Sequence, residues 1–229
     1  LLIAFGDGMV IFCSQYWGKK QFAPMKKIIA LTMHFGIAVA VILFAVISVF
    51  PEQAMLCFTS DRQIIEEGVR YLHTIRFTYL FFAVTQMLLA ALRSTEVAGI
   101  ALRLSVMALV VNCGINYVLI FGRFGAPELG VTGAAIGTLT ARILECGVLI
   151  FYVIRKEQYL RLQLSDFLKR DWQFLRDYLK ITLPLLVLCG LWGINTAMQT
   201  VVLGHMNSAA IAANSAASNL YLMLKSSAV

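Results

Sequence analysis

Long apolar runs separated by short polar connections dominate the hydrophobic pattern of this chain. A membrane-spanning helix needs roughly 20 apolar residues; five runs reach that length, and one at each end of the chain is cut short. We expect an all-α, polytopic membrane bundle, because helices satisfy their own backbone hydrogen bonds in hydrocarbon. The predicted helices are Leu1 to Trp17, Ile28 to Phe50, Tyr71 to Leu92, Ile100 to Phe121, Leu129 to Ile154, Leu179 to Leu203, and one starting near Ser208.

The composition agrees with a membrane protein. Hydrophobic residues make up 60% of the chain and charged residues 14%, the mean hydropathy is +0.80, and a soluble domain carries about 25% charged residues. The five cysteines lack metal-ligand spacing and are expected to be small apolar packing residues. Because the chain opens inside an apolar run, we expect it to be a fragment with at least one helix before Leu1.

The basic residues of the connections predict the orientation. The first, third and fifth loops, at 18–27, 93–103 and 155–180, carry four, two and seven Lys or Arg residues, and the loops between them carry two, one and none. Basic residues accumulate in cytoplasmic loops. We therefore place these three loops in the cytoplasm and the protein in the plasma (inner) membrane, and we read the net charge of +7 as a topology signal rather than as nucleic-acid binding.

The fifth loop is the longest connection, and in it aromatic and leucine residues alternate with charges at roughly helical spacing. This pattern predicts an amphipathic segment on the inner leaflet; an ordinary cytoplasmic loop is the alternative. It divides the chain into first-lobe helices at 1–154, a linker at 155–178, and the start of a second lobe at 179–229.

Two amides lie within the fourth predicted helix. Asn112 and Asn116 are four residues apart and therefore share one helix face. An amide facing acyl chains would lose its partners at a cost of roughly 2–7 kcal/mol, so this face should meet protein, water or an ion. The following helix is rich in small residues, which allow close backbone approach: Gly130, Gly133, Ala134, Ala135 and Gly137.

Other polar residues in the predicted spans have two readings each. Asp7 is an intramembrane acid and hence a functional candidate, or it is solvated near the outer end of its helix. Asn195 and Gln199 line a cavity or pack within the bundle, and Trp192 stacks on a cationic compound or fills space. Arg142 and Glu145, three residues apart, are expected to neutralise each other.

Several stretches together resemble the multidrug and toxic compound extrusion (MATE) transporters. They occur in the family's order and cover nearly the whole chain, which then corresponds to the second to seventh helices of a twelve-helix transporter and the start of the eighth. The resemblance implies an antiporter that exports cationic or amphipathic compounds in exchange for Na⁺ or H⁺. The stretches are GDGMVIFCSQYWGKK (6–20), ALRSTEVAG (91–99), NCGINYVLIFGRFGAPELGVTGAAIGT (112–138), TLPLLVLCGLWGINTAMQTVVLG (182–204) and AAIAANSAAS (209–218).

The resemblance also suggests site residues, with two departures from the family. Family members with a first-lobe cation site carry an Asp four residues after an Asn, where this chain has Asn112 and Asn116. Amide oxygens can ligate Na⁺, with Thr138 as a further oxygen, but a neutral Asn116 cannot take up a proton. A carboxylate that some members carry on the seventh helix falls here on Trp192. The alternative is that both asparagines only join helices.

Two other classes of membrane protein are alternatives to a MATE-type transporter. A lipid-linked oligosaccharide flippase of related architecture should line its cavity with several basic residues, but the predicted spans hold only Arg76, Arg142 and Lys225. An intramembrane enzyme lacks support, since no Ser/His/Asp set, HExxH motif or acidic metal cluster lies at membrane depth. We expect no cofactor beyond the coupling ion, no metal site, no enzymatic activity and a monomeric transporter.

Overall fold

A computed structural model describes residues 2–59, 61–156, 172–204 and 214–219. Within these residues every regular element is helical, which confirms the predicted all-α membrane bundle. A short helix at 214–219 falls in the region of the last predicted span, most of which lies outside the described residues. The other elements are α1 (Leu2–Gly18), α2 (Phe22–Val49), α3 (Pro51–Leu56), α4 (Arg62–Ile75), α5 (Thr78–Ser94), α6 (Ala98–Ile120), η1 (Arg123–Gly125), α7 (Gly130–Lys156) and α9 (Trp172–Gly204).

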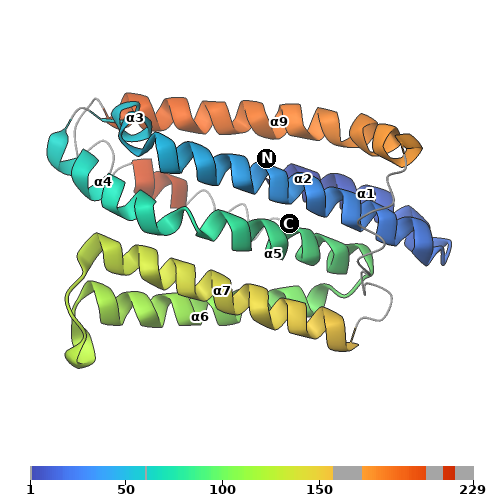
Figure 1. Ribbon diagram of the computed structural model, residues 1–229, viewed down its shortest axis with the longest axis horizontal. Helices are drawn as coiled ribbons and strands as arrows, with labels where there is room; N and C mark the ends of the chain where they lie inside the picture. The colour runs from blue at the N-terminus through green and yellow to red at the C-terminus, as the bar shows by residue number, and fades with distance from the viewer. Residues whose placement is uncertain (1, 60, 157–171, 205–213, 220–229) are drawn as a thin grey trace.

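The helices run side by side with α5 at the centre (Figure 1). On one side α5 packs against α1 and α2, and on the other it packs against α7, which pairs closely with α6. Helix α9 lies on the far side of α1 and α2, so α9 and the α6–α7 pair occupy opposite sides of the bundle. The turns after α1 and α5 lie at one end and α3 and η1 at the other, as the predicted alternation of loops requires.

Four described helices are long and apolar enough to cross a membrane on their own. They match the predicted spans within a few residues at most ends, because hydropathy alone locates a continuous apolar helix. The match confirms a multi-pass membrane protein. The four spans are Phe22–Val49, Gly99–Ile120, Gly130–Lys156 and Phe174–Leu203.

The third predicted span, Tyr71 to Leu92, falls on the end of α4 and most of α5. These two helices meet at a bend of 51°, and they are long and apolar enough to span a membrane only when taken together. At the bend the N–H groups of Tyr79 and Leu80 bond to carbonyls only three residues back, at 3.3 Å each, so the helix tightens locally and changes direction. The guanidinium of Arg76 lies 5.5 Å from the Phe44 ring and 5.2 Å from the Phe77 ring.

The core of the bundle lies between α1, α2 and α5, with a contribution from the start of α9. Four buried methionines belong to it, and their flexible thioethers fill irregular gaps between helices. The buried residues include Met9, Met25, Ile28, Ile29, Met87, Leu92 and Tyr178.

Helix α9 is attached to the described bundle through its first turns. The fully buried Tyr178 donates a hydrogen bond from its hydroxyl to the carbonyl oxygen of Phe5 at 2.9 Å and stacks on Phe35. Beyond Leu183 most of the helix is exposed. Of the predicted linker, 157–171 lies outside the described residues and 172–178 forms the start of α9, so the lobe boundary stays a prediction.

Helices α6 and α7 approach each other through small residues, as predicted from the sequence. A Cβ atom added to the buried Gly133 would lie 2.8 Å from the backbone oxygen of Leu119, and one added to Gly137 would overlap the amide oxygen of Asn116. Glycine at these positions therefore sets how closely the two helices pack.

We predict that Gly133→Ala destabilises the full-length protein by about 1–3 kcal/mol, because the new methyl group meets backbone that cannot rotate away. The matched control is Gly147→Ala on the same helix, where an added Cβ meets nothing within 4 Å, and alanine there should be neutral or stabilise by up to about 1 kcal/mol. Thermal unfolding in detergent measures both. Equal melting temperatures for the two variants would contradict the close approach.

Candidate functional site

A chain of hydrogen bonds joins α6 to α7 at the predicted polar face. The amide nitrogen of Asn116 donates to the amide oxygen of Asn112 at 3.1 Å, and the amide nitrogen of Asn112 donates to the hydroxyl of Thr138 at 3.3 Å. Thr138 in turn donates to the carbonyl of Ala134 at 2.9 Å. The two asparagines thus share one helix face, as the sequence predicts, and Thr138 on the neighbouring helix is the partner of Asn112.

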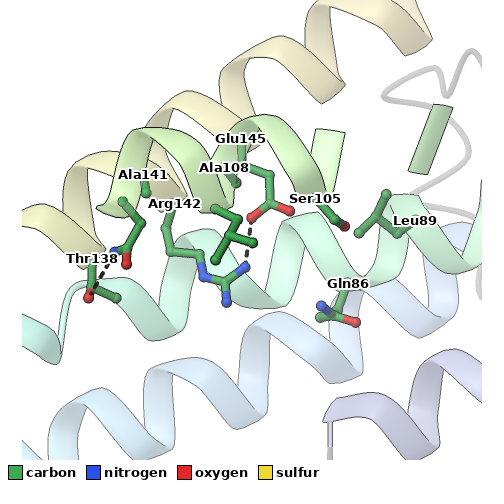
Figure 2. Close-up of a pocket in the computed structure, with 10 residues that line it drawn as sticks. Gln86, Leu89, Ser105, Ala108, Thr138, Ala141, Arg142 and Glu145 are labelled. Atoms are coloured by element: carbon green, nitrogen blue, oxygen red, sulfur yellow. Dashed lines mark hydrogen bonds and ion pairs between the residues drawn. The ribbon is translucent and has the colours of Figure 1, made fainter. Parts of the chain in front are cut away.

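Asn112 and Thr138 border a pocket of about 420 Å³ between α5, α6 and α7, which we name the α5–α7 pocket (Figure 2). Its lining combines apolar residues with amide, hydroxyl and charged groups, and each of the three helices contributes. The lining residues are Gln86, Leu89, Ser105, Ala108, Leu109, Asn112, Thr138, Ala141, Arg142 and Glu145. Sequence reasoning missed Gln86 and Ser105, because a single polar residue in an apolar helix does not show which neighbour it faces.

Asn116 is not one of the residues that line the pocket. Its amide oxygen is buried against Gly137 and has no hydrogen-bond partner within the described residues. A buried acceptor without a partner costs free energy, so the Asn116 amide is the incompletely satisfied end of the hydrogen-bond chain.

Between the Asn112–Thr138 pair and the end of the pocket marked by Ser105 and Leu89, Arg142 and Glu145 form an ion pair with an N–O distance of 2.7 Å (Figure 2). The Glu145 side chain is 2% exposed and that of Arg142 is 34% exposed. The guanidinium also lies over the Phe82 ring, 5.1 Å from its centre. The predicted mutual neutralisation of these residues is confirmed.

The remaining candidates lie apart from this pocket. Asn195, Gln199 and Trp192 are exposed on the second half of α9, across the bundle from α6 and α7. Asp7 pairs with Arg93 at 3.5 Å, near the C-terminal end of α5. The Asp7 side chain is 42% exposed, and its functional role and its solvated position near the outer end both stay predictions.

The pocket offers oxygen atoms rather than soft metal ligands. Among the described residues, no group of three or more His, Cys, Asp or Glu side chains is placed to hold a metal ion. Amide and hydroxyl oxygens suit a hard monovalent or divalent cation, and the apolar walls suit the hydrocarbon part of an organic compound.

We predict that Thr138→Val weakens the α6–α7 contact by about 0.5–2 kcal/mol, because the Asn112 amide loses its acceptor on α7. Thr140→Val is the matched control, since Thr140 bonds only to the carbonyl four residues back, as Thr138 also does. Thermal unfolding of the two full-length variants separates the interhelical bond from the shared local bond. A control that unfolds as early as Thr138→Val would refute the role of the interhelical bond.

Curated relatives of this chain include two probable multidrug resistance proteins. The chain is 27% identical over 188 residues to NorM of Rhizobium meliloti (strain 1021), which covers 80% of this chain and 39% of the relative. It is 26% identical over 219 residues to YoeA of Bacillus subtilis (strain 168), which covers 92% of this chain and 44% of the relative. The chain thus spans less than half the length of these relatives.

Solved structures share the fold. An inward-facing multidrug resistance MATE family transporter of the MOP superfamily matches with a TM-score of 0.69 at 15% identity, over 89% of this chain and 44% of that chain. A crystal structure of MATE in complex with MaL6 matches with a TM-score of 0.65 at 18% identity, over 80% of this chain and 41% of that chain. The family model described as MatE matches residues 1–118, more than half of the 229 residues. The chain therefore belongs to the multidrug and toxic compound extrusion (MATE) family of membrane transporters.

Proposed function

We propose that the full-length protein containing this chain is a secondary active antiporter, which exports cationic or amphipathic compounds in exchange for Na⁺ or H⁺ by alternating access. The observation that carries the proposal is the α5–α7 pocket, in which amide, hydroxyl and carboxylate groups are held between helices of a MATE-type lobe. Polar groups at membrane depth mark ion and substrate pathways. Membership of a multidrug efflux family supports the same substrate class.

Na⁺ is the coupling ion that the polar face favours. Rotation of both side-chain amide groups by a half-turn exchanges their oxygen and nitrogen positions and keeps a hydrogen bond between Asn112 and Asn116. The Asn112 oxygen then lies beside the hydroxyl oxygen of Thr138. These two oxygens together can bind a hard cation. Neither amide titrates. Proton coupling in this lobe would therefore have to use another group, and Glu145 is the acid that lines the pocket.

A lipid-linked oligosaccharide flippase of related architecture is the alternative. Its pyrophosphate headgroup needs several free basic groups in the cavity. Among the lining residues of the α5–α7 pocket the basic side chain is Arg142, which is already paired with Glu145. The pocket therefore favours cationic over anionic cargo.

The sidedness follows from the loops. We place the protein in the plasma (inner) membrane with loops 18–27, 93–103 and 155–180 in the cytoplasm. We expect it to act as a monomeric transporter whose partners are small cationic or amphipathic compounds and lipid. The basic bias of these loops supports this orientation.

We predict that the full-length protein drives energy-dependent efflux of a cationic dye from intact cells, and that Na⁺ stimulates this efflux. Asn112→Ala removes an oxygen ligand and should raise the Na⁺ concentration for half-maximal efflux about tenfold, equivalent to about 1.4 kcal/mol. Asn116→Asp should introduce a dependence on pH, because a carboxylate can exchange a proton.

Dye accumulation unchanged by deletion of the protein, under both Na⁺ and proton gradients, would refute the transport function. If transport is present but neither substitution changes its ion dependence, the asparagines only join the helices. Thr140→Val, on the same helix as Thr138 but bonded within its own helix, is the control for nonspecific damage.

We predict that a membrane-impermeant maleimide applied to intact cells labels Arg123→Cys in a background without native cysteines. Lys19→Cys should react only after the membrane is opened, because the two residues lie in connections at opposite ends of the bundle. The reverse labelling pattern would invert the proposed orientation.

A further inference from the structure

The positively charged side chain of Arg142 lines the α5–α7 pocket. Its guanidinium is held by two groups, the carboxylate of Glu145 at 2.7 Å and the Phe82 ring with its centre at 5.1 Å. Phe82 comes from α5, one helical turn before the pocket residue Gln86, whereas Glu145 lies on α7. The two holding groups therefore come from different helices and converge on one positive charge.

The holding groups form a site that needs a cation. Glu145 is 2% exposed, and a buried carboxylate without a positive partner is strongly unfavourable. An aromatic face within about 6 Å attracts a cation through its ring quadrupole, more strongly when water is excluded. If Arg142 moves away, another cation is needed to take its place.

Arg142 has room to move away. Its side chain is 34% exposed, against 2% for Glu145, and it borders a pocket of about 420 Å³. Both residues are on α7, three positions apart, so the pair can separate by a change of the Arg142 side chain alone, without a shift of the helix.

We propose that the Glu145 carboxylate and the Phe82 ring form a subsite for flat cations that carry N–H groups. The Arg142 guanidinium occupies this subsite and competes with the transported compound for it. Such a compound binds by displacing the guanidinium. This inference rests on the proposed function and names its substrate class more narrowly. A planar amidinium or guanidinium group reproduces both contacts of Arg142, because it donates paired hydrogen bonds to a carboxylate and stacks on a ring. A cation without N–H groups reproduces only the stacking and the charge.

The experiment titrates purified full-length protein in detergent with 4′,6-diamidino-2-phenylindole, a fluorescent flat dye with two amidinium groups. Arg142→Gln removes the competitor and should tighten dye binding about tenfold, whereas Glu145→Gln should weaken it about tenfold. Phe82→Leu should weaken binding about threefold. Tetraphenylphosphonium lacks N–H groups. For this cation Arg142→Gln should therefore increase the affinity by less than about threefold, which is half of the tenfold effect on a logarithmic scale.

The matched control is Arg70→Gln. Arg70 also pairs with an acid three residues away, Glu67, at 3.3 Å, but both side chains are well exposed and lie outside the α5–α7 pocket. This substitution should leave dye affinity unchanged. An equal gain in Arg70→Gln and Arg142→Gln would show a general effect of lost positive charge and would overturn the proposal.

Arg142→Gln leaves Glu145 without its partner and can impair folding, so Arg142→Lys provides a second variant. Lysine keeps the charge but lacks the planar fork, and should tighten dye binding about threefold. Unchanged or weaker dye binding in whichever of these two variants folds, as judged by thermal unfolding, would overturn the proposal. Dye export by the wild-type protein together with that result would leave the transport function standing, whereas absence of export would refute the function itself.

Discussion

The scarcity of hydrogen-bond partners in hydrocarbon is the constraint on which the rest of this structure depends. It accounts for the helices, which satisfy their backbone groups internally, and for the way polar side chains are placed within them. Hydroxyl groups such as those of Thr32, Ser48 and Thr140 bond back to carbonyls of their own helix. Side chains too long or too polar for this solution need partners among the side chains of their own helix, on a neighbouring helix or on an ion.

The α5–α7 pocket is where such side chains gather. Gly133 and Gly137 bring α7 close to α6, which puts the Asn112 amide within reach of the Thr138 hydroxyl. One to two helical turns further along α7, Arg142 and Glu145 satisfy each other. Close packing and polar lining thus have the same origin, since small residues let backbones approach and the approach allows polar groups to meet without lipid between them.

The sequence predicted those features of the fold and site that depend on local pattern. Continuous apolar runs located most spans, the spacing of Asn112 and Asn116 placed them on one helix face, and the spacing of Arg142 and Glu145 predicted their pair. The bend at Arg76 was missed, because hydropathy measures how apolar a segment is and not its direction. Gln86 and Phe82 were missed because their roles arise from the side of α5 that packs on α7, which only the tertiary structure shows.

Arg76, at the bend between α4 and α5, bears on how this span enters the bilayer during synthesis. A charged residue near the middle of an inserting helix costs about 2.5–3.5 kcal/mol, and α4 and α5 qualify as a span only when taken together. Phe44 on α2 supplies one of the two rings over the guanidinium. Because α2 precedes α4 and α5 in the chain, the Phe44 ring that faces the guanidinium is already made when Arg76 is synthesised.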